Sequence, residues 1–401
     1  MRWPFGKKTL IPAPTGPSGI GTTRFDLAAP GERRIPVQAW YPAQANSAPR
    51  ELYLDDALRA ALADLLHVPK FVLPQNPSYS ARDAPALPGR CPVVVFNHGF
   101  GSFQKQSSTL LEELASHGYV VLSVGHPRES LVVQYADGST LRHDPDHPAW
   151  KATAAGLKAV EQNARELEPL LARARAAATP EGLAEAMRAL AAHASYAPLM
   201  PVLDVWAADT RAVLDALGQL DEGTLCPLLR GTIDSSRVGA FGHSLGGILS
   251  GQLAMTEPRI RAAMNFDGAQ LPPAAGRYVL GAPACFLYAD ATRLGKTRVT
   301  SEGMNDALAA SGPVGSCSGC LVGANHLNFT DMNNLSMAAR MLGSVDRAQM
   351  ARVLRAVTVG FFDRHLKGMP PAGFEPSPTL RVRCAPRASV EPPGHRLEAH
   401  A

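Results

Sequence analysis

The 401-residue chain lacks a basic block, an apolar N-terminal run and an ordered set of cysteines. Its formal net charge is only +4 and is spread along the chain, which argues against nucleic acid as a partner. The first ten residues are too polar for a signal peptide or a membrane span, so we expect a cytoplasmic protein with no transmembrane segment. A hydrophobic share of 46% and a charged share of 18% exclude a disordered chain and indicate a globular one.

The six cysteines form no framework that would define a disulfide-rich or zinc-binding protein. Three of them lie in apolar, strand-like runs, where buried reduced thiols are expected. Cys317 and Cys320 have the C-x-x-C spacing, but no second Cys/His pair lies at zinc-finger distance. We therefore expect a local loop there, with a disulfide or redox role as the lesser alternative. The sequence predicts no metal site and no cofactor.

Residues 238–247 carry the strongest functional pattern. They read Val-Gly-Ala-Phe-Gly-His-Ser-Leu-Gly-Gly, an apolar strand that runs into G-x-S-x-G and then into a helix of small residues. This is the nucleophile elbow of α/β-hydrolases, in which a serine sits on a strained turn between strand and helix. Glycine is expected at 242 and 246 because a Cβ would collide with neighbouring backbone. The pattern predicts that Ser244 is a nucleophile.

Strand and helix patterns alternate on both sides of the elbow. Extended runs at 22–27 and 35–41 predict a hairpin. The helical period of 51–67 predicts a helix that packs on the core or the pocket rim, and the composition of 74–92 predicts a Pro-rich linker. Buried strands are expected at 92–96, 119–124, 260–266, 282–288 and 320–323.

The helical patterns complete the expected architecture. Residues 151–199 are expected to form a helical insertion or lid, with a break at Thr179-Pro180. The last long helix should begin at an Asp346 cap and stop at Gly368, which leaves 369–401 as a C-terminal tail. We predict one α/β-hydrolase domain, with a mostly parallel, doubly wound sheet and right-handed crossovers.

A serine hydroxyl needs a base to remove its proton, and the base needs an acid to orient it, in the chain order Ser, Asp or Glu, His. Among the histidines after Ser244, only His326 lies in a loop directly after a strand. Asp267 and Asp290 each end a strand after the elbow, and either carboxylate could orient the ring. The glycine after Asp267 favours it slightly, but strand positions leave both open.

The oxyanion of an acyl-transfer intermediate needs two backbone N–H donors. Leu245 fills the first role because it follows the nucleophile. Phe100 is the expected second donor, because Gly99 and Gly101 on either side let the main chain approach closely. His98 beside them is interpreted as a structural residue.

Six motifs together resemble the platelet-activating factor acetylhydrolase family, of the plasma, calcium-independent phospholipase A2 type, and its bacterial relatives. They lie at 95–101, 114–120, 242–247, 265–268, 326–331 and 361–368. The resemblance implies that Asp267 is the triad acid beside Ser244 and His326, with Leu245 and Phe100 as oxyanion donors. It also implies hydrolysis of short or oxidised acyl esters with no metal. Residues 151–199 look longer than the family's connection, which would reshape the acyl pocket.

We therefore expect a serine carboxylic-ester hydrolase that acts on short-chain, small-molecule acyl esters through an acyl-enzyme. A dienelactone hydrolase or a cutinase-like polyester hydrolase of the same fold is the first alternative. A non-catalytic binding protein on this scaffold is the second, although such proteins usually lack one of the three residues that are present here. No pattern in the sequence determines an oligomeric state.

Overall fold

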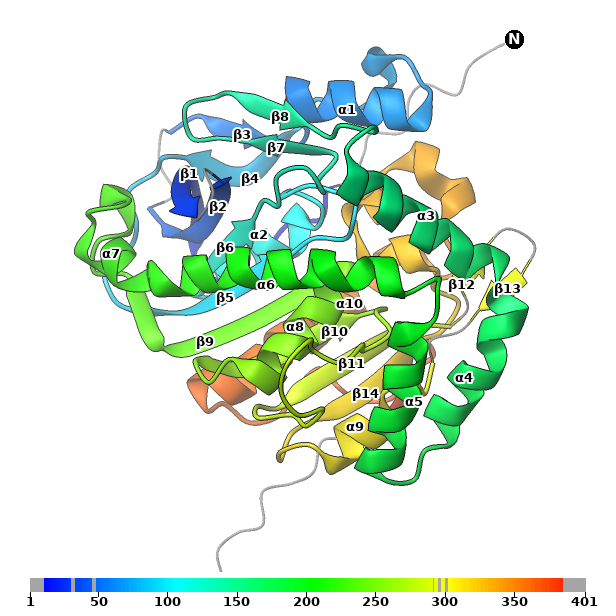
Figure 1. The fold of residues 1–401 in the computed structure, drawn as a ribbon. Coiled ribbons are helices and arrows are strands. Elements are labelled where there is room, and N and C mark those ends of the chain that lie inside the picture. The colour runs from blue at the N-terminus through cyan, green and yellow to red at the C-terminus, as the bar shows by residue number, and fades with distance from the viewer. Residues whose placement is uncertain are drawn as a thin grey trace, which may run out of the picture.

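The computed structural model describes residues 11–29, 33–44, 48–290, 292–294, 297–299 and 302–384. An eleven-stranded sheet, in the order β15-β14-β11-β10-β9-β5-β6-β2-β1-β4-β3, runs through it (Figure 1). Its six central strands pair in parallel, which confirms the mostly parallel, doubly wound sheet. They are β6 (Val120–Val124), β5 (Cys91–Asn97), β9 (Ile233–His243), β10 (Ile260–Phe266), β11 (Ala284–Ala289) and β14 (Cys317–Leu321).

Shorter or antiparallel strands extend the sheet at both ends. The expected hairpin is present as β1 (Gly19–Ala29) and β2 (Arg33–Ala43), while its turn at 30–32 lies outside the described residues. The other additions are β3 (Arg50–Leu52), β4 (Pro77–Arg82) and β15 (Leu380–Cys384). Two small hairpins stand apart from the sheet: β7 (Val132–Gln134) with β8 (Thr140–Arg142), and β12 (Thr292–Leu294) with β13 (Thr297–Val299).

Four sequence-based expectations were wrong in detail. The 74–92 linker contains β4, and the 369–401 tail contains β15, which pairs with β14. The helix expected from residue 51 begins only at Asp56, because Asp55 caps it and accepts from Leu58 N. Cys317 and Cys320 lie in β14 rather than in a loop, and residues three apart on a strand point to opposite faces.

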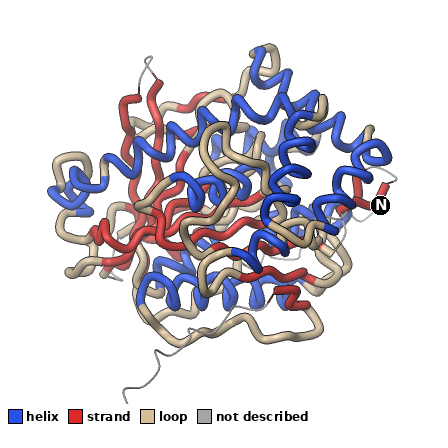
Figure 2. The backbone as a smooth tube through the Cα atoms, turned by 60° about the horizontal axis from the view of Figure 1, so that its bottom comes forward, coloured by secondary structure: helices blue, strands red, loops and turns tan. Residues whose placement is uncertain are grey.

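Helices cover both faces of the sheet, as Figures 1 and 2 show from two directions. Side chains alternate along β5, so that Val93 and Val95 join one buried cluster and Val94 and Phe96 the other. The first cluster includes α6 (Met200–Asp215) and α8 (Leu245–Thr256), and the second includes α2 (Ser108–Ser116) and α10 (Arg347–Lys367). α10 is capped by Asp346 and ends at left-handed Gly368, as expected.

Residues 148–199 form α3 (Pro148–Gln162), α4 (Ala164–Ala176), α5 (Pro180–Ala192) and the short helix η2 (Ala197–Leu199). The expected break is confirmed, because Thr179 caps α5 and Pro180 occupies its first turn. Leu171, Leu183 and Met187 are buried in the same cluster as α6, so these helices are packed onto the core. No helix in the described ranges is both long and apolar enough to span a bilayer.

The remaining helical segments are short: α1 (Asp56–Leu66), η1 (Lys70–Val72), α7 (Leu217–Glu222), η3 (Pro227–Leu229), α9 (Asp306–Ser311), η4 (His326–Phe329), η5 (Asp331–Asn334) and η6 (Ser336–Met341). The segments η4 to η6 follow β14, and α1 faces the carboxyl ends of the central strands. Sites in open α/β sheets form at that edge. Together, α1 and η4 to η6 supply much of the wall of the pocket described next.

Candidate active site

Ser244 lies on the sharp turn between β9 and α8. Its backbone angles, φ 58° and ψ −120°, are unusual for a non-glycine residue and indicate the strain expected of a nucleophile elbow. Ser244 N donates to Phe266 O at 2.8 Å, and Ile248 N donates to Ser244 O at 3.0 Å. A Cβ on Gly246 would clash with the carbonyl of Asn97, which explains the glycine at that position.

Asp267 follows β10, the strand next to β9, and its φ is 54°. Its Oδ2 lies 2.7 Å from His326 Nδ1, and its Oδ1 accepts from Ala289 N at 2.8 Å. The Asp267 side chain is 1% exposed and that of His326 is 30% exposed. Because the carboxylate only accepts, Nδ1 of a neutral His326 carries the proton, and Nε2 is the free acceptor for a hydroxyl.

The loop that carries His326 is held from both ends. Asn325 caps η4, and its side chain accepts from His326 N at 2.8 Å. At the other end, the Asp331 carboxylate accepts from Ser108 Oγ at 2.8 Å and from Thr109 N at 3.1 Å, at the N-terminus of α2. Burial raises the pKa of Asp331, although these hydrogen bonds work against that shift. The base loop is therefore attached to a helix of the main fold.

The loop after β5 offers a second main-chain donor beside the elbow. His98 Nδ1 lies 2.7 Å from Gly99 O, and burial together with neighbouring His126 lowers the pKa of His98 to about 3. The neutral ring therefore donates from Nδ1 to Gly99 O. Since C=O and N–H of one trans peptide point in opposite directions, this bond turns Phe100 N–H away from His98. The Phe100 ring packs against Trp150 of α3, with ring centroids 4.6 Å apart and the two planes tilted by 36°.

A pocket of about 550 Å³ is lined by all five predicted site residues: Ser244, Asp267, His326, Phe100 and Leu245. This volume is typical of small-molecule sites. The rest of the wall is mostly apolar and comes from α1, α3, η2, single residues just before α1 and η2, and the segments after β14: Leu54, Leu62, Leu65, Leu66, Leu157, Val160, Tyr196, Leu199, Met332, Leu335 and Met341. Such a wall favours uncharged acyl or alkyl groups.

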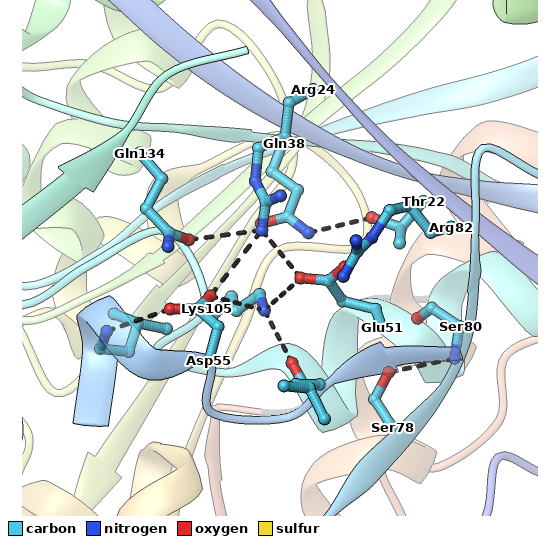
Figure 3. Close-up of polar contacts among 12 residues, drawn as sticks. Thr22, Arg24, Gln38, Glu51, Asp55, Ser78, Ser80, Arg82, Lys105 and Gln134 are labelled. Atoms are coloured by element: carbon cyan, nitrogen blue, oxygen red, sulfur yellow. Dashed lines mark hydrogen bonds and ion pairs between the residues drawn. The ribbon is translucent and has the colours of Figure 1, made fainter. Parts of the chain in front are cut away.

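A buried ion-pair cluster supports the α1 side of this pocket (Figure 3). Lys105 Nζ lies 2.7 Å from Glu51 Oε1 and 3.2 Å from Asp55 Oδ2, and the Lys105 and Glu51 side chains are each 3% exposed. Arg24 and Arg82 also contact Glu51. Burial opposes ionisation of Glu51, but the charges of Lys105 and Arg24 prevail and lower its pKa to about 2. The positive charge of Lys105 is therefore balanced by the carboxylates of Glu51 and Asp55. These ion pairs hold the start of α1 against the loop after β5.

Among the described residues, Asp290, Glu302 and Cys320 are the one group whose potential metal-ligand atoms lie within 4.8 Å of one another. Arg381 Nη1 and Arg383 Nη1 lie 2.7 and 2.9 Å from Glu302 Oε1. Burial, followed by the neighbouring carboxylates Glu302 and Asp290, raises the pKa of the Cys320 thiol to about 12. We interpret the group as an ion-pair cluster that binds β15 to the sheet.

The structure thus brings the predicted site residues together and separates the two candidate acids. Asp290 accepts from Gly323 N at 3.1 Å, while Asp267 contacts the imidazole. His243 was not among the site residues predicted from the sequence, yet its ring lies 4.3 Å from that of His326. A polar, ring-bearing residue at the end of an otherwise apolar strand was the available signal.

Comparisons with known proteins place the chain beside acetylhydrolases and an esterase. The model of the family described as platelet-activating factor acetylhydrolase, isoform II, matches residues 5–366. Platelet-activating factor acetylhydrolase of Cavia porcellus is 25% identical over 273 residues, which cover 66% of this chain and 56% of that protein. The Gallus gallus protein of the same name is 20% identical over 288 residues, which cover 69% of this chain and 62% of that protein. The chain thus spans less than two thirds of either relative.

A solved structure supports the fold over nearly the whole chain. Ferulic acid esterase from Streptomyces cinnamoneus superposes with a TM-score of 0.66 and 23% sequence identity, and the match covers 93% of this chain and 98% of the esterase. At that identity the likeness establishes the architecture, which is the α/β-hydrolase fold expected from the elbow.

Proposed function

The chain belongs to the platelet-activating factor acetylhydrolase, isoform II, family, and from this premise we propose that it is a serine carboxylic-ester hydrolase. One observation carries the proposal. The Asp267 carboxylate lies 2.7 Å from His326 Nδ1, in the same pocket as a serine on a strained elbow. A buried carboxylate, an imidazole and a serine in that relation are the parts of a nucleophilic triad.

In the acylation step, Ser244 Oγ attacks the ester carbonyl carbon while His326 Nε2 takes the hydroxyl proton. The imidazolium that results is stabilised by Asp267, which also holds the ring in the required tautomer. The tetrahedral intermediate then collapses: the C–O bond to the alcohol breaks, and His326 returns the proton to the leaving oxygen. The products of this step are a free alcohol and an acyl-serine.

Deacylation repeats these transfers with water. His326 takes a proton from water, whose oxygen attacks the acyl carbon, and the acid leaves as Ser244 regains its proton. In both halves we propose that the N–H groups of Leu245 and Phe100 stabilise the oxyanion. Two observations support this role: Leu245 begins α8, whose N-terminus faces the elbow, and the Gly99–Phe100 peptide is oriented by His98.

The substrate class follows from the pocket wall. The charged side chains Lys105 and Asp331 line the pocket but are occupied by buried partners, and the remaining wall is mostly apolar. We propose small esters with short, uncharged acyl groups as substrates. Residues 151–199 would act as a cover over this site, since Leu157, Val160 and Leu199 contribute to the wall and the helices behind them are packed on the core.

The test is hydrolysis of p-nitrophenyl acetate and butyrate by wild type and by Ser244→Ala. We expect the variant to lose turnover by at least about 10⁴-fold, because the nucleophile is absent, while circular dichroism and Tm stay unchanged. Ser250→Ala is the matched control: this buried serine lies in α8 and donates to Gly246 O at 2.8 Å. It should retain activity within about threefold, because its hydroxyl bonds only to the backbone of its own helix and does not line the pocket.

Retained turnover in Ser244→Ala, or an equal loss in Ser250→Ala, would overturn the assignment. A panel of lactones and polyester fragments, run beside the short esters, tests the alternative of a dienelactone hydrolase or a cutinase-like enzyme. Faster turnover of either class than of p-nitrophenyl acetate would favour that alternative. A cytoplasmic location stays a prediction from the N-terminal residues.

A further inference from the structure

Gln106 lies in the loop between β5 and α2, is only 5% exposed, and connects two parts of the site. Its side-chain Oε1 accepts from Gly99 N at 2.6 Å, and its Nε2 lies 2.8 Å from His243 Nδ1. The other ring nitrogen, His243 Nε2, lies 3.0 Å from the carbonyl oxygen of His326. A single amide and a single imidazole therefore join the oxyanion loop, the elbow and the base loop.

The direction of every hydrogen bond in this series, from Gly99 through Gln106 and His243 to His326, is determined by the two backbone groups at its ends. Gly99 N–H can only donate, so the oxygen of the Gln106 amide must face it and the NH₂ must face His243. The His326 carbonyl can only accept, so His243 must carry its proton on Nε2 and leave Nδ1 as the acceptor. One amide orientation and one neutral tautomer satisfy all three bonds.

The neutral state of His243 agrees with its surroundings. Burial, followed by the neighbouring His326, holds the pKa of His243 well below its usual range. A protonated His243 would donate from both nitrogens and would lose its bond from the Gln106 NH₂. It would also place a positive charge 4.3 Å, ring to ring, from the imidazole that becomes positive in the proposed reaction.

The main chain of Gln106 adds a fourth connection. Its carbonyl oxygen accepts from Asp331 N at 2.8 Å, five residues after His326. The base loop is thus held at two points, through His243 at its start and directly by Gln106 at its end. Gly99 N–H, meanwhile, belongs to the peptide directly before the one that carries the Phe100 donor.

We propose that Gln106 is a positioning residue, which works with His243 to set the distance between the oxyanion donor at Phe100 and the base His326. The inference rests on the proposed hydrolase function. Stabilisation of the transition state depends on both groups reaching one reacting carbonyl, whereas ground-state binding depends mainly on the apolar wall. Loss of Gln106 should therefore lower kcat and leave KM nearly unchanged.

The first experiment is Gln106→Met, which keeps the length of the side chain and removes both hydrogen bonds. We expect kcat for p-nitrophenyl butyrate to fall by about 10- to 100-fold, part of the effect of losing one oxyanion donor, with KM within about threefold. The affinity for a trifluoromethyl ketone, which mimics the tetrahedral intermediate, should fall by the same factor as kcat/KM.

Gln104→Met is the matched control. Gln104 lies in the same loop, is also 5% exposed, and contacts Pro36 O at 3.1 Å and Gln134 N at 3.3 Å instead of the site. It should lower Tm as much as Gln106→Met does while kcat stays within about threefold. Equal losses of kcat in the two variants would mean that the effect is general destabilisation, and would overturn the inference.

A double-mutant cycle with His243→Phe tests the connection itself. Both substitutions break the same series of hydrogen bonds, so the loss of kcat in the double variant should be far smaller than the product of the two single losses. Independent, multiplicative losses would overturn the proposed link. If wild type itself hydrolyses none of the esters, the proposed function falls and this inference with it; if wild type is active and Gln106→Met matches it, only this inference falls.

Discussion

Asp267→Asn is the substitution for which the structure gives the most definite expectation. The carboxylate serves two donors at once, His326 Nδ1 at 2.7 Å and Ala289 N at 2.8 Å. The two donors bond to different carboxylate oxygens, and asparagine replaces one of those oxygens with an NH₂ group that cannot accept. If its NH₂ turns toward the ring, Nδ1 must become the acceptor, and the proton moves to Nε2. In that tautomer His326 cannot take the proton of Ser244.

The magnitude follows from the lost charge as well as from the tautomer. Two opposite unit charges about 4 Å apart attract by about 4 kcal/mol at an effective dielectric constant near 20. That energy acts mainly when the imidazole is positive, and about 1.4 kcal/mol corresponds to a factor of ten in rate. We therefore expect kcat to fall by about 10³- to 10⁴-fold, with KM little changed.

The assay compares Asp267→Asn with Asp290→Asn on p-nitrophenyl butyrate, with Tm measured for both. Asp290 contacts Gly323 N and lies 3.9 Å from Arg381, so its variant should lose some stability but keep kcat within about threefold. The opposite pattern, in which only Asp290→Asn loses activity, would refute the assignment of the acid. Equal losses would indicate that the geometry at Asp267 has no special role.

Three further predictions concern stability and folding. The pKa of Glu51 is lowered to about 2, so its ionised form should stabilise the fold above about pH 4.5 and lose that effect as the pH falls toward 2. Urea titrations should show Glu51→Gln to be about 3 kcal/mol less stable at pH 7 and less sensitive to acid between pH 4.5 and 2. An unchanged loss of stability in acid would contradict this. Met187→Ala, at a fully buried position of α5, should cost about 2–5 kcal/mol of unfolding free energy, and a cost below about 1 kcal/mol would mean that α5 is not packed as described. Gly246→Ala should abolish both ester turnover and soluble expression, since its methyl group would meet the Asn97 carbonyl; wild-type turnover would refute the close approach at the elbow.

The central fold was predictable because its strands are encoded locally. Strands β5 and β6 are continuous apolar runs that only a sheet covered on both faces can bury, and α10 carries both of its caps in the sequence. The added strands lacked this signature. In β14, Gly319 packs close to Leu380 and Phe374, so small residues that suggested a loop are instead needed for close packing of a strand.

The site was predictable to the extent that each residue belongs to a short motif. Ser244 lies in the elbow, and His326 and Asp267 each follow a strand at the same edge of the sheet. The positions of the strands could not distinguish Asp267 from Asp290 as the acid, because the choice depends on the contact between Asp267 and His326, which are 59 residues apart. The contact between His243 and Gln106 joins residues 137 apart, so the local signal at His243 could not show which side chain it meets.

The central claim is that Ser244 is a nucleophile activated by His326. Its most direct test is reaction of the wild-type protein with a fluorophosphonate probe, followed by peptide mass spectrometry. We expect one modified residue, Ser244, with labelling abolished in Ser244→Ala and slowed by at least about 10³-fold in His326→Ala. Labelling at any other residue, or ester turnover by a protein whose Ser244 stays unmodified, would contradict it.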